Sequence, residues 1–341
     1  MCIALVHVEG TSNSNTMYRC YTSTDPRSAL FNREELFNRP TKRLYTWANC
    51  DIIGGQDSDM LGTWKALNTK LKRIVLLTNG RALNTLGTIG AAQSSCSTGS
   101  SGDEPSICSR GVLVKILASE PKPLSDAVQI AFSSSLYHSF NLIAIQFDME
   151  SYSFDVCKIV HRTPNATNAS LITQNEVTLN RHSMAESLCL IMENMGISTF
   201  SLTCPSQSDF PSAKGYNLAK AYSMLWQRNE HKDIPKLIAL LSQRIQGVKG
   251  EHQNMQISSA KTPIDTSADV DVGEILEQKL SATFIPPFMI PSGSFGTVSS
   301  SILLYSYPSD DGMFYEKKYN QHARLNEDKE IKISFHLCKK E

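Results

Sequence analysis

The chain has 341 residues, and its 33 basic residues balance its 33 acidic ones, so the formal net charge at neutral pH is +0. This balance removes the electrostatic case for a nucleic-acid partner or an anionic membrane surface. No apolar run reaches the about 18 residues of a membrane-spanning helix, and the segment after Met1 becomes polar too soon for a signal peptide. We therefore expect no stable membrane insertion, a cytoplasmic location and nine reduced cysteines.

The N-terminal third predicts short strands that lie close together in the sequence. Apolar residues dominate four runs, at 2–8, 28–31, 62–67 and 73–78. The pair Gly54-Gly55 predicts a turn. Short connections of this kind join antiparallel neighbours, because parallel strands need a longer crossover.

The middle of the chain predicts helices around one hairpin. Ser125 is a candidate N-cap for a helix that runs to about His138, and 141–148 with 152–160 form a hairpin. The sequence from Ser183 to Glu186 matches a capping box, which predicts a helix that buries Leu188, Ile191 and Met192.

Two further helices and three strands follow. The helices are expected at 215–228 and 233–246, the second with Asp233 as its cap and Pro235 in its first turn. The strands are expected at 298–307, 313–319 and 329–337.

Polar segments interrupt these elements. They are predicted as insertions near 9–26, 93–108, 161–182 and 247–272. Strands outnumber helices and come in hairpins, with the helices grouped between them, which favours an α+β fold of antiparallel sheets covered by helices. No boundary separates two cores, so we expect one domain over 1–341.

Two places carry candidate chemistry. Removal of Met1 would leave an α-amine and a thiol on Cys2, so that one residue supplies both a base and a nucleophile. The alternative is that Met1 is retained and Cys2 packs as a small buried residue. The cluster Asn32-Arg33-Glu34-Glu35 ends the second predicted strand, either as a functional site or as a turn with a solvated ion pair.

Ordered landmarks carry a resemblance that covers nearly the whole chain. They are Met1-Cys2-Ile3, Asn32-Arg33-Glu34-Glu35, Arg39-Pro40-Thr41, Gly54-Gly55-Gln56-Asp57, Gly62-Thr63-Trp64, Leu77-Thr78-Asn79, Ser109-Arg110-Gly111, Phe140-Asn141-Leu142, Phe284-Ile285, Phe295-Gly296-Thr297 and Tyr315-Glu316. In this order and spacing the chain resembles the transport and Golgi organisation protein 2 family, also called NRDE after its motif.

The chain also departs from the family pattern. Glu34 replaces the aspartate of the NRDE motif, Gln56 replaces a basic residue, and Ser139 replaces a glycine. Val298 stands where the family has an arginine, and an asparagine is lost near Cys204-Pro205.

The resemblance implies an N-terminal nucleophile hydrolase-like fold, an αββα sandwich of two antiparallel sheets between helix layers. By that likeness Cys2 is the nucleophile, Arg33 favours the thiolate or binds an anionic group, and Glu34 orients the α-amine. Asn79 would then offer an amide to an oxyanion, although a turn residue is an equal reading. Whether Glu34 or Glu35 faces inward stays open, and Trp64 is expected in the core.

The resemblance implies two functions. The first is a trafficking protein that binds or mobilises haem or an acyl-CoA and affects Golgi organisation and secretion, in the cytoplasm with association to the Golgi or mitochondria. Asn32, Arg33, Glu34 and Glu35 would contact the ligand. The second is a hydrolase of amides or thioesters that uses Cys2. Neither requires a cofactor, and the eight histidines show no metal-binding spacing.

Overall fold

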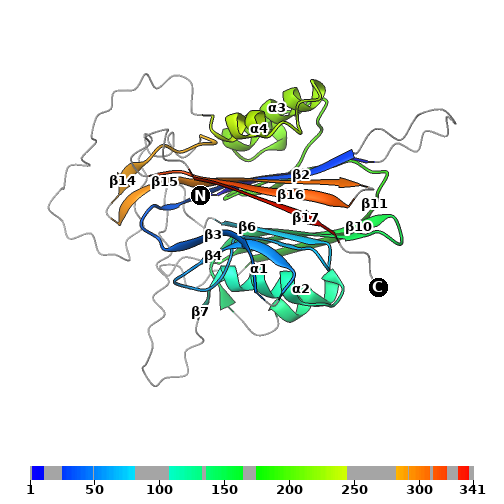
Figure 1. Ribbon diagram of the computed structural model, residues 1–341, viewed down its shortest axis with the longest axis horizontal. Helices are drawn as coiled ribbons and strands as arrows, with labels where there is room; N and C mark the ends of the chain where they lie inside the picture. Colours follow the sequence, from blue (N-terminus) through cyan, green and yellow to red (C-terminus); the bar gives the residue numbers. More distant parts are fainter. Residues whose placement is uncertain are drawn as a thin grey trace.

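Two stacked antiparallel sheets form the centre of the molecule (Figure 1). The computed structural model describes residues 2–10, 25–48, 50–80, 107–132, 136–163, 174–243, 282–290, 292–307, 310–320 and 329–337. Four α-helices lie within these ranges, in pairs on the two outer faces of the sheets (Figure 1). The predicted α+β class with antiparallel sheets covered by helices is confirmed.

The first sheet contains the N-terminal strand near its middle. Its order is β13-β12-β1-β2-β15-β16-β17, and β14 pairs with β15. The strands are β1 (Ile3–Val8), β2 (Asp25–Leu36), β12 (Leu188–Glu193), β13 (Gly196–Thr199), β14 (Phe288–Ile290), β15 (Gly293–Tyr307), β16 (Asp311–Lys318) and β17 (Lys329–His336). Strand β1 is buried throughout because it lies between β2 and β12 and between two packed layers.

The second sheet has the order β11-β10-β9-β6-β5-β4-β3. Its strands are β3 (Thr41–Thr46), β4 (Ile52–Asp57), β5 (Lys65–Asn68), β6 (Arg73–Asn79), β9 (Phe140–Asp148), β10 (Ser153–Arg162) and β11 (Gln174–Ser183). A separate pair, β7 (Ile107–Cys108) and β8 (Leu136–Tyr137), is parallel.

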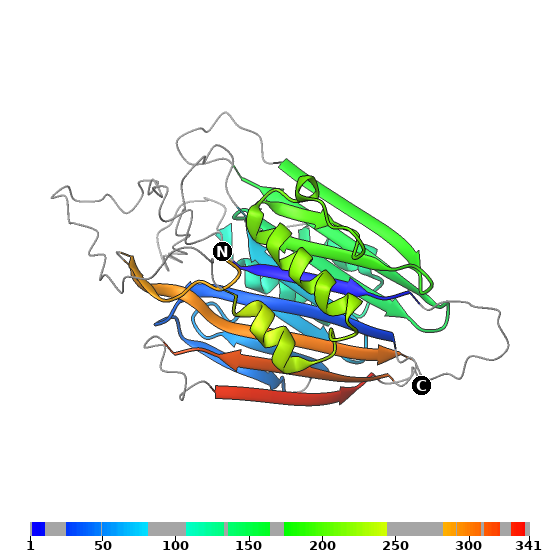
Figure 2. The same ribbon diagram turned by 90° about the horizontal axis from the view of Figure 1, so that it is seen from above.

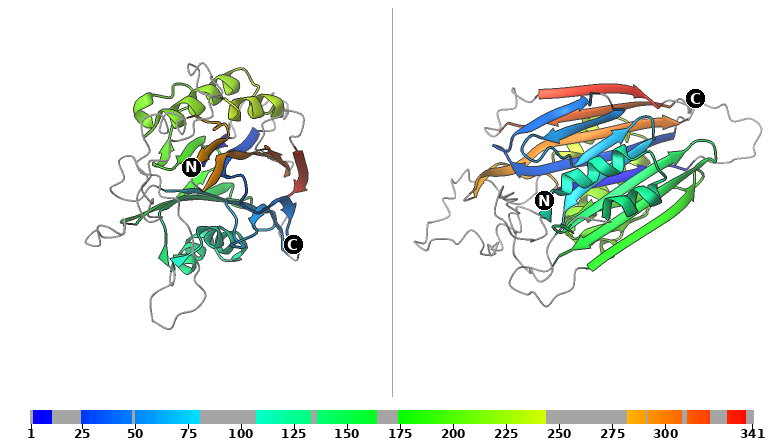
Figure 3. Two further views of the ribbon diagram at one scale, coloured as in Figure 1. Left: turned by 90° about the vertical axis from the view of Figure 1, so that its left-hand side faces the viewer. Right: turned by 90° about the horizontal axis from the view of Figure 1, so that it is seen from below.

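The helices cover the outer faces of the sheets. Helices α3 (Ala213–Gln227) and α4 (Ile234–Leu241) lie across the first sheet (Figure 2). Helices α1 (Arg110–Ser119) and α2 (Leu124–Phe132) lie under the second, as both views of Figure 3 show. A short 3-10 turn, Gln207–Asp209, precedes α3.

Three apolar clusters hold these layers together. One fills the space between the sheets and contains Ala4, Phe31 and Trp64. The other two lie between each sheet and its own helices. Because side chains alternate along a strand, Leu30 of β2 packs toward α3 and α4 while Phe31 packs between the sheets.

The predicted turn at Gly54-Gly55 is wrong, since both glycines lie inside β4. A Cβ atom on Gly54 would lie 2.7 Å from the backbone oxygen of Lys65, and one on Gly55 would lie 2.9 Å from ring carbons of Trp64. These glycines therefore permit close packing in the sheet. Glycine serves both turns and close contacts inside strands, so the sequence alone does not distinguish the two.

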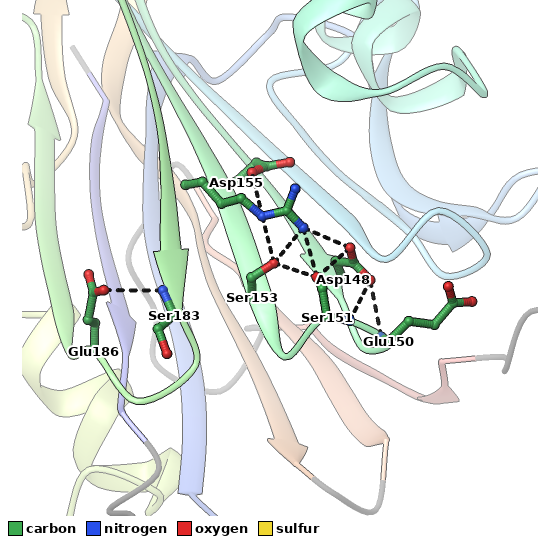
Figure 4. Close-up of polar contacts among 8 residues, drawn as sticks. Asp148, Glu150, Ser151, Ser153, Asp155, Ser183 and Glu186 are labelled. Carbon is green, nitrogen blue, oxygen red and sulfur yellow. Dashed lines mark hydrogen bonds and ion pairs between the residues drawn. The ribbon is translucent and has the colours of Figure 1, made fainter.

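The helix predicted after the capping box is also wrong, because Leu188–Glu193 is strand β12. The local signal is real. The backbone N–H of Ser183 donates to Oε1 of Glu186 at 3.2 Å, as Figure 4 shows. This bond closes the turn from β11 into β12. The chain then extends because β12 pairs with β1 on one side and β13 on the other.

Other predictions are confirmed with shifted ends. The hairpin appears as β9 and β10, the two later helices as α3 and α4, and the three C-terminal strands as β15 to β17. Asp233 caps α4 by accepting the N–H of Lys236 at 3.3 Å, with Pro235 in the first turn.

The remaining differences concern boundaries and several elements that the sequence did not predict. The helix expected over 125–138 ends at Phe132, and the strand expected over 62–67 begins at Lys65. Strand β11 occupies part of the predicted insertion 161–182, while α1 and β3 were not expected. The insertions predicted at 9–26, 93–108 and 247–272 lie largely outside the described residues.

The exposed turn between β9 and β10 forms a separate polar cluster (Figure 4). The carboxylate of Asp148 accepts the N–H of Glu150 at 3.1 Å and the hydroxyl of Ser151 at 2.6 Å. Arg181 of β11 adds an ion pair to Asp148 at 2.8 Å. Because these groups are exposed and mutually satisfied, they fix the hairpin and contribute little to global stability.

Candidate functional site

The Cys2 side chain lies between the sheets, directly before β1. The residue is 7% exposed, and its thiol points to the backbone oxygen of Glu34 at 4.0 Å. Burial raises the pKa of this thiol, although the positive charge of Arg33 acts in the opposite direction. The thiol is therefore protonated at neutral pH and needs a base before it can attack a carbonyl.

Strand β2 divides the Asn32-to-Glu35 cluster between two faces. Arg33 and Glu35 follow Phe31 onto the face between the sheets, whereas Asn32 and Glu34 follow Leu30 toward the helices. The four residues are adjacent in sequence but cannot all surround one ligand.

Asn32 holds the helix layer to the sheet. The residue is fully buried, and its amide donates to the backbone oxygens of Leu241 at 2.8 Å and Thr283 at 2.7 Å. Its own oxygen accepts the hydroxyl of Ser300 at 2.5 Å. These bonds give Asn32 a structural function and leave it no exposed atom for a ligand.

The two glutamates have different environments, which answers the question that the sequence left open. Glu34 is 2% exposed and forms an ion pair with Lys214 of α3. Glu35 is partly exposed and lies 3.9 Å from Arg39, which in turn binds Asp57 at 2.7 Å. Glu34 is thus the inward residue, on the face opposite the Cys2 thiol, and Glu35 belongs to an outer ion-pair network.

Among the residues predicted to form the site, Arg33 lines a cavity that could hold a ligand. Its guanidinium carbon lies 4.0 Å from the centre of the Trp64 ring, and its Nη1 donates to the hydroxyl of Thr41 at 2.9 Å. Stacking of this kind holds a planar guanidinium in one orientation. Trp64 therefore packs in the core, as expected, and also lines the cavity beside Arg33.

This cavity of about 200 Å³ opens between the two sheets. We call it the basic pocket and define it by the residues that determine its charge and shape, Arg33, Arg39, Arg43, Trp64, Glu316 and Lys318. Arg39 is compensated by Asp57, and Glu316 by Lys65 at 2.7 Å. Among the described residues, no carboxylate lies within ion-pair distance of the other three cations, Arg33, Arg43 and Lys318.

Asn79 lies apart from the other predicted site residues. It ends β6 opposite Phe140 and is half-buried. Leu76 packs between the sheets and Leu77 toward the helices, so strand alternation places Asn79 on the helix-facing side. None of the hydrogen bonds among the described residues involves its side-chain amide. The structure therefore brings Cys2 and Arg33 together and leaves Asn79 on another face.

Sequence reasoning missed three cations near the site. Arg43 and Lys318 line the basic pocket, and Arg110 at the start of α1 donates to the backbone oxygen of Ser139 at 2.9 Å. Burial lowers the pKa of Arg110 to about 10, while attraction from Cys2 and Glu35 opposes that change. Basic residues are frequent on strand and helix ends, so only the fold identifies Arg43 and Lys318, whereas Arg110 lies in the landmark Ser109-Arg110-Gly111.

Two further observations limit the chemistry. The histidine, cysteine and carboxylate side chains of the described segments form no cluster of three that could hold a metal ion. Likewise, no helix in the described ranges combines the length and hydrophobicity needed to cross a bilayer.

A family model described as Transport and Golgi organisation 2 matches residues 1–321. No curated protein and no solved structure matches the chain.

Proposed function

Because the chain belongs to the Transport and Golgi organisation 2 family, we propose that it acts in transport and Golgi organisation by binding an amphipathic, anionic metabolite. Haem and acyl-CoA are the ligands that we expect. The observation that supports this proposal is the basic pocket, where Arg33 lies against Trp64 without a carboxylate partner among the described residues. A buried, uncompensated guanidinium favours an anionic ligand that supplies the missing charge.

The protein would act in the cytoplasm, in association with Golgi membranes or mitochondria. Subcellular fractionation of the tagged full chain tests this part of the proposal. A protein found only in the nuclear or extracellular fraction would contradict it.

Direct titration tests the ligand. Purified full-length protein is titrated with haemin and, separately, with palmitoyl-CoA, and the Arg33→Gln variant is compared with Lys122→Gln, an exposed cation outside the pocket. We expect binding that weakens at least about tenfold in Arg33→Gln, the effect of losing one charged hydrogen bond. No binding of either ligand, or equal binding by both variants, would argue against the proposal.

A second function is a cysteine hydrolase. The observation that favours it is the position of Cys2 at the head of β1, on the same face as Arg33, in a two-sheet sandwich covered by helices. The burial of the thiol and the position of Glu34 on the opposite face weigh against it. A β-lactone probe should label Cys2 alone, and Cys2→Ala should abolish turnover. Labelling spread over several cysteines would exclude this function.

A further inference from the structure

The uncompensated charge of the basic pocket exceeds what one carboxylate can neutralise. Arg33, Arg43 and Lys318 converge on the cavity without an ion-pair partner among the described residues. Burial lowers the pKa of Lys318, and repulsion from Arg43 lowers it further. A carboxylate brings a single negative charge, whereas a phosphate monoester carries about −1.5 to −2 charges and three strong acceptor oxygens at neutral pH.

Two side chains that line the pocket also carry a buried hydrogen-bond donor without an acceptor among the described residues. Arg43 donates one Nη2 bond, to the backbone oxygen of Lys329 at 2.6 Å, and its buried Nε has no partner among the described residues. The indole Nε1 of Trp64, which is 8% exposed, likewise lacks a partner there. A buried N–H without an acceptor is costly, and here both lie in side chains on the wall of the cavity.

The size of the cavity indicates which part of a ligand it holds. Pockets that enclose a drug-sized molecule measure about 300–1,000 Å³. The basic pocket, at about 200 Å³, is smaller. It therefore fits a compact anionic head group, with the rest of the ligand outside the cavity.

Two strand irregularities shape this cavity. The pairing of β3 with β4 shifts between Lys42 and Tyr45, next to Arg43. The pairing of β15 with β2 shifts between Thr297 and Ser299, and Ser299 also lines the cavity. Bulges redirect side chains and are enriched beside binding sites. Their position on both walls of one cavity indicates a formed site.

From these observations we infer that the basic pocket binds a phosphate group, through Arg33, Arg43 and Lys318. This inference rests on the proposed function and narrows it, because it assigns the anionic end of the ligand to phosphate and not to carboxylate. Phosphate monoesters, diphosphates and phospholipid head groups share this chemistry.

Matched small probes test the inference. The full-length protein is titrated calorimetrically with hexyl phosphate and with hexanoate, which share an alkyl chain and differ in the anionic group. The double variant Arg43→Gln/Lys318→Gln removes two partly or fully exposed cations, so the fold is expected to persist. The control, Lys122→Gln/Arg228→Gln, makes the same charge change on exposed residues outside the pocket.

We expect hexyl phosphate to bind the wild type and the control equally, and to bind the pocket variant at least about tenfold more weakly. Vesicles of phosphatidylcholine with phosphatidic acid, in a parallel arm, distinguish a lipid head group from a free ester, since only a head-group site retains the protein on them. Hexanoate binding as tight as hexyl phosphate overturns the inference and leaves the proposed function intact. Phosphate binding that the pocket variant does not weaken also overturns it. Absence of both haemin and palmitoyl-CoA binding by the wild type in the separate titration is the result that removes the proposed function itself.

Discussion

The buried ion pair beneath the basic pocket offers a quantitative test of the fold. Lys65 is fully buried, and its Nζ lies 2.7 Å from Oε2 of Glu316, which is 2% exposed. The same ammonium donates to the hydroxyl of Ser301, and Oε1 of Glu316 accepts the N–H of Leu44 at 3.1 Å. The pair links β5 of the second sheet to β15 and β16 of the first.

Replacement of Lys65 by Met leaves the Glu316 carboxylate buried without its cation. Removal of one partner from a buried pair costs about 3–5 kcal/mol, a large part of the about 5–15 kcal/mol that stabilises a typical protein. Replacement of both partners, as Lys65→Met/Glu316→Leu, removes the charges together. This double variant should recover most of the loss, because an apolar pair of similar volume is often as stable as the buried ion pair.

The pH dependence gives this prediction a second measurement. In the wild type burial raises the pKa of Glu316, but Lys65 and the N–H of Leu44 lower it more, so the net pKa is lowered. The wild type therefore gains stability from Glu316 above its unfolded pKa and loses it as the pH falls through the lowered folded value. In Lys65→Met the carboxylate loses the cation that lowers its pKa most, so the effect of burial is opposed only by the N–H of Leu44 and by Arg43. The pKa of Glu316 should therefore rise, and the deficit should shrink on acidification.

Urea unfolding of the three proteins at neutral and at mildly acidic pH measures these free energies. A single variant that loses less than about 1 kcal/mol, or a double variant no more stable than the single one, would show that Glu316 does not depend on Lys65 for compensation.

Three further predictions concern other buried groups. Burial lowers the pKa of His7 from 6.5 to about 3. Between these two values the unfolded chain takes up a proton that the native state does not. The free energy of unfolding should therefore fall by on the order of 5 kcal/mol as the pH drops from 6.5 to about 3. His7→Gln should flatten this dependence in urea unfolding, and an unchanged slope would contradict the assignment. Asn32→Ala leaves two buried carbonyls without their donor and should cost about 3 kcal/mol by the same method, whereas a loss below about 1 kcal/mol would show that the bonds matter little. Gly55→Ala places a methyl group 2.9 Å from the Trp64 ring, so the substitution should lower the free energy of unfolding by about 1–3 kcal/mol and weaken hexyl phosphate binding. Unaltered binding would show that the position of Trp64 does not affect the pocket.

Local sequence patterns correctly predicted those helices and strands whose local preference agrees with their tertiary packing. Helix α4 has a cap at Asp233, a proline in its first turn and apolar residues at helical spacing. The C-terminal strands β15 to β17 each pair with the next strand along the chain. In these segments local preference and tertiary packing favour the same structure.

The predictions of secondary structure were wrong where tertiary contacts determine the conformation of the chain. The Ser183 to Glu186 turn has the hydrogen bond of a capping box, but pairing with β1 extends the chain after it. Gly54 and Gly55 carry a turn signal, yet their missing Cβ atoms serve close packing within the sheet. A single sequence contains no measure of those long-range contacts.

The site was predicted in part for the same reason. Cys2 and Arg33 lie on one face, as the resemblance implied, because β1 and β2 pair side by side. The alternation of β2 assigns Asn32 and Glu34 to the helix-facing side, and alternation along β6 does the same for Asn79. Arg43 and Lys318 join Arg33 only through the pairing of distant strands and two bulges, which no local pattern specifies.

The cations Arg33, Arg43 and Lys318, which have no ion-pair partner among the described residues, imply that the basic pocket holds an anionic metabolite. Native mass spectrometry of the full chain, purified from its own type of cell, would detect this metabolite, with Arg33→Gln and Lys122→Gln prepared in the same way. We expect an added mass of an anionic small molecule on the wild type and on Lys122→Gln, and its loss from Arg33→Gln. Absence of any added mass on all three proteins, or an adduct that persists on Arg33→Gln, would contradict the binding of an anionic metabolite in this pocket.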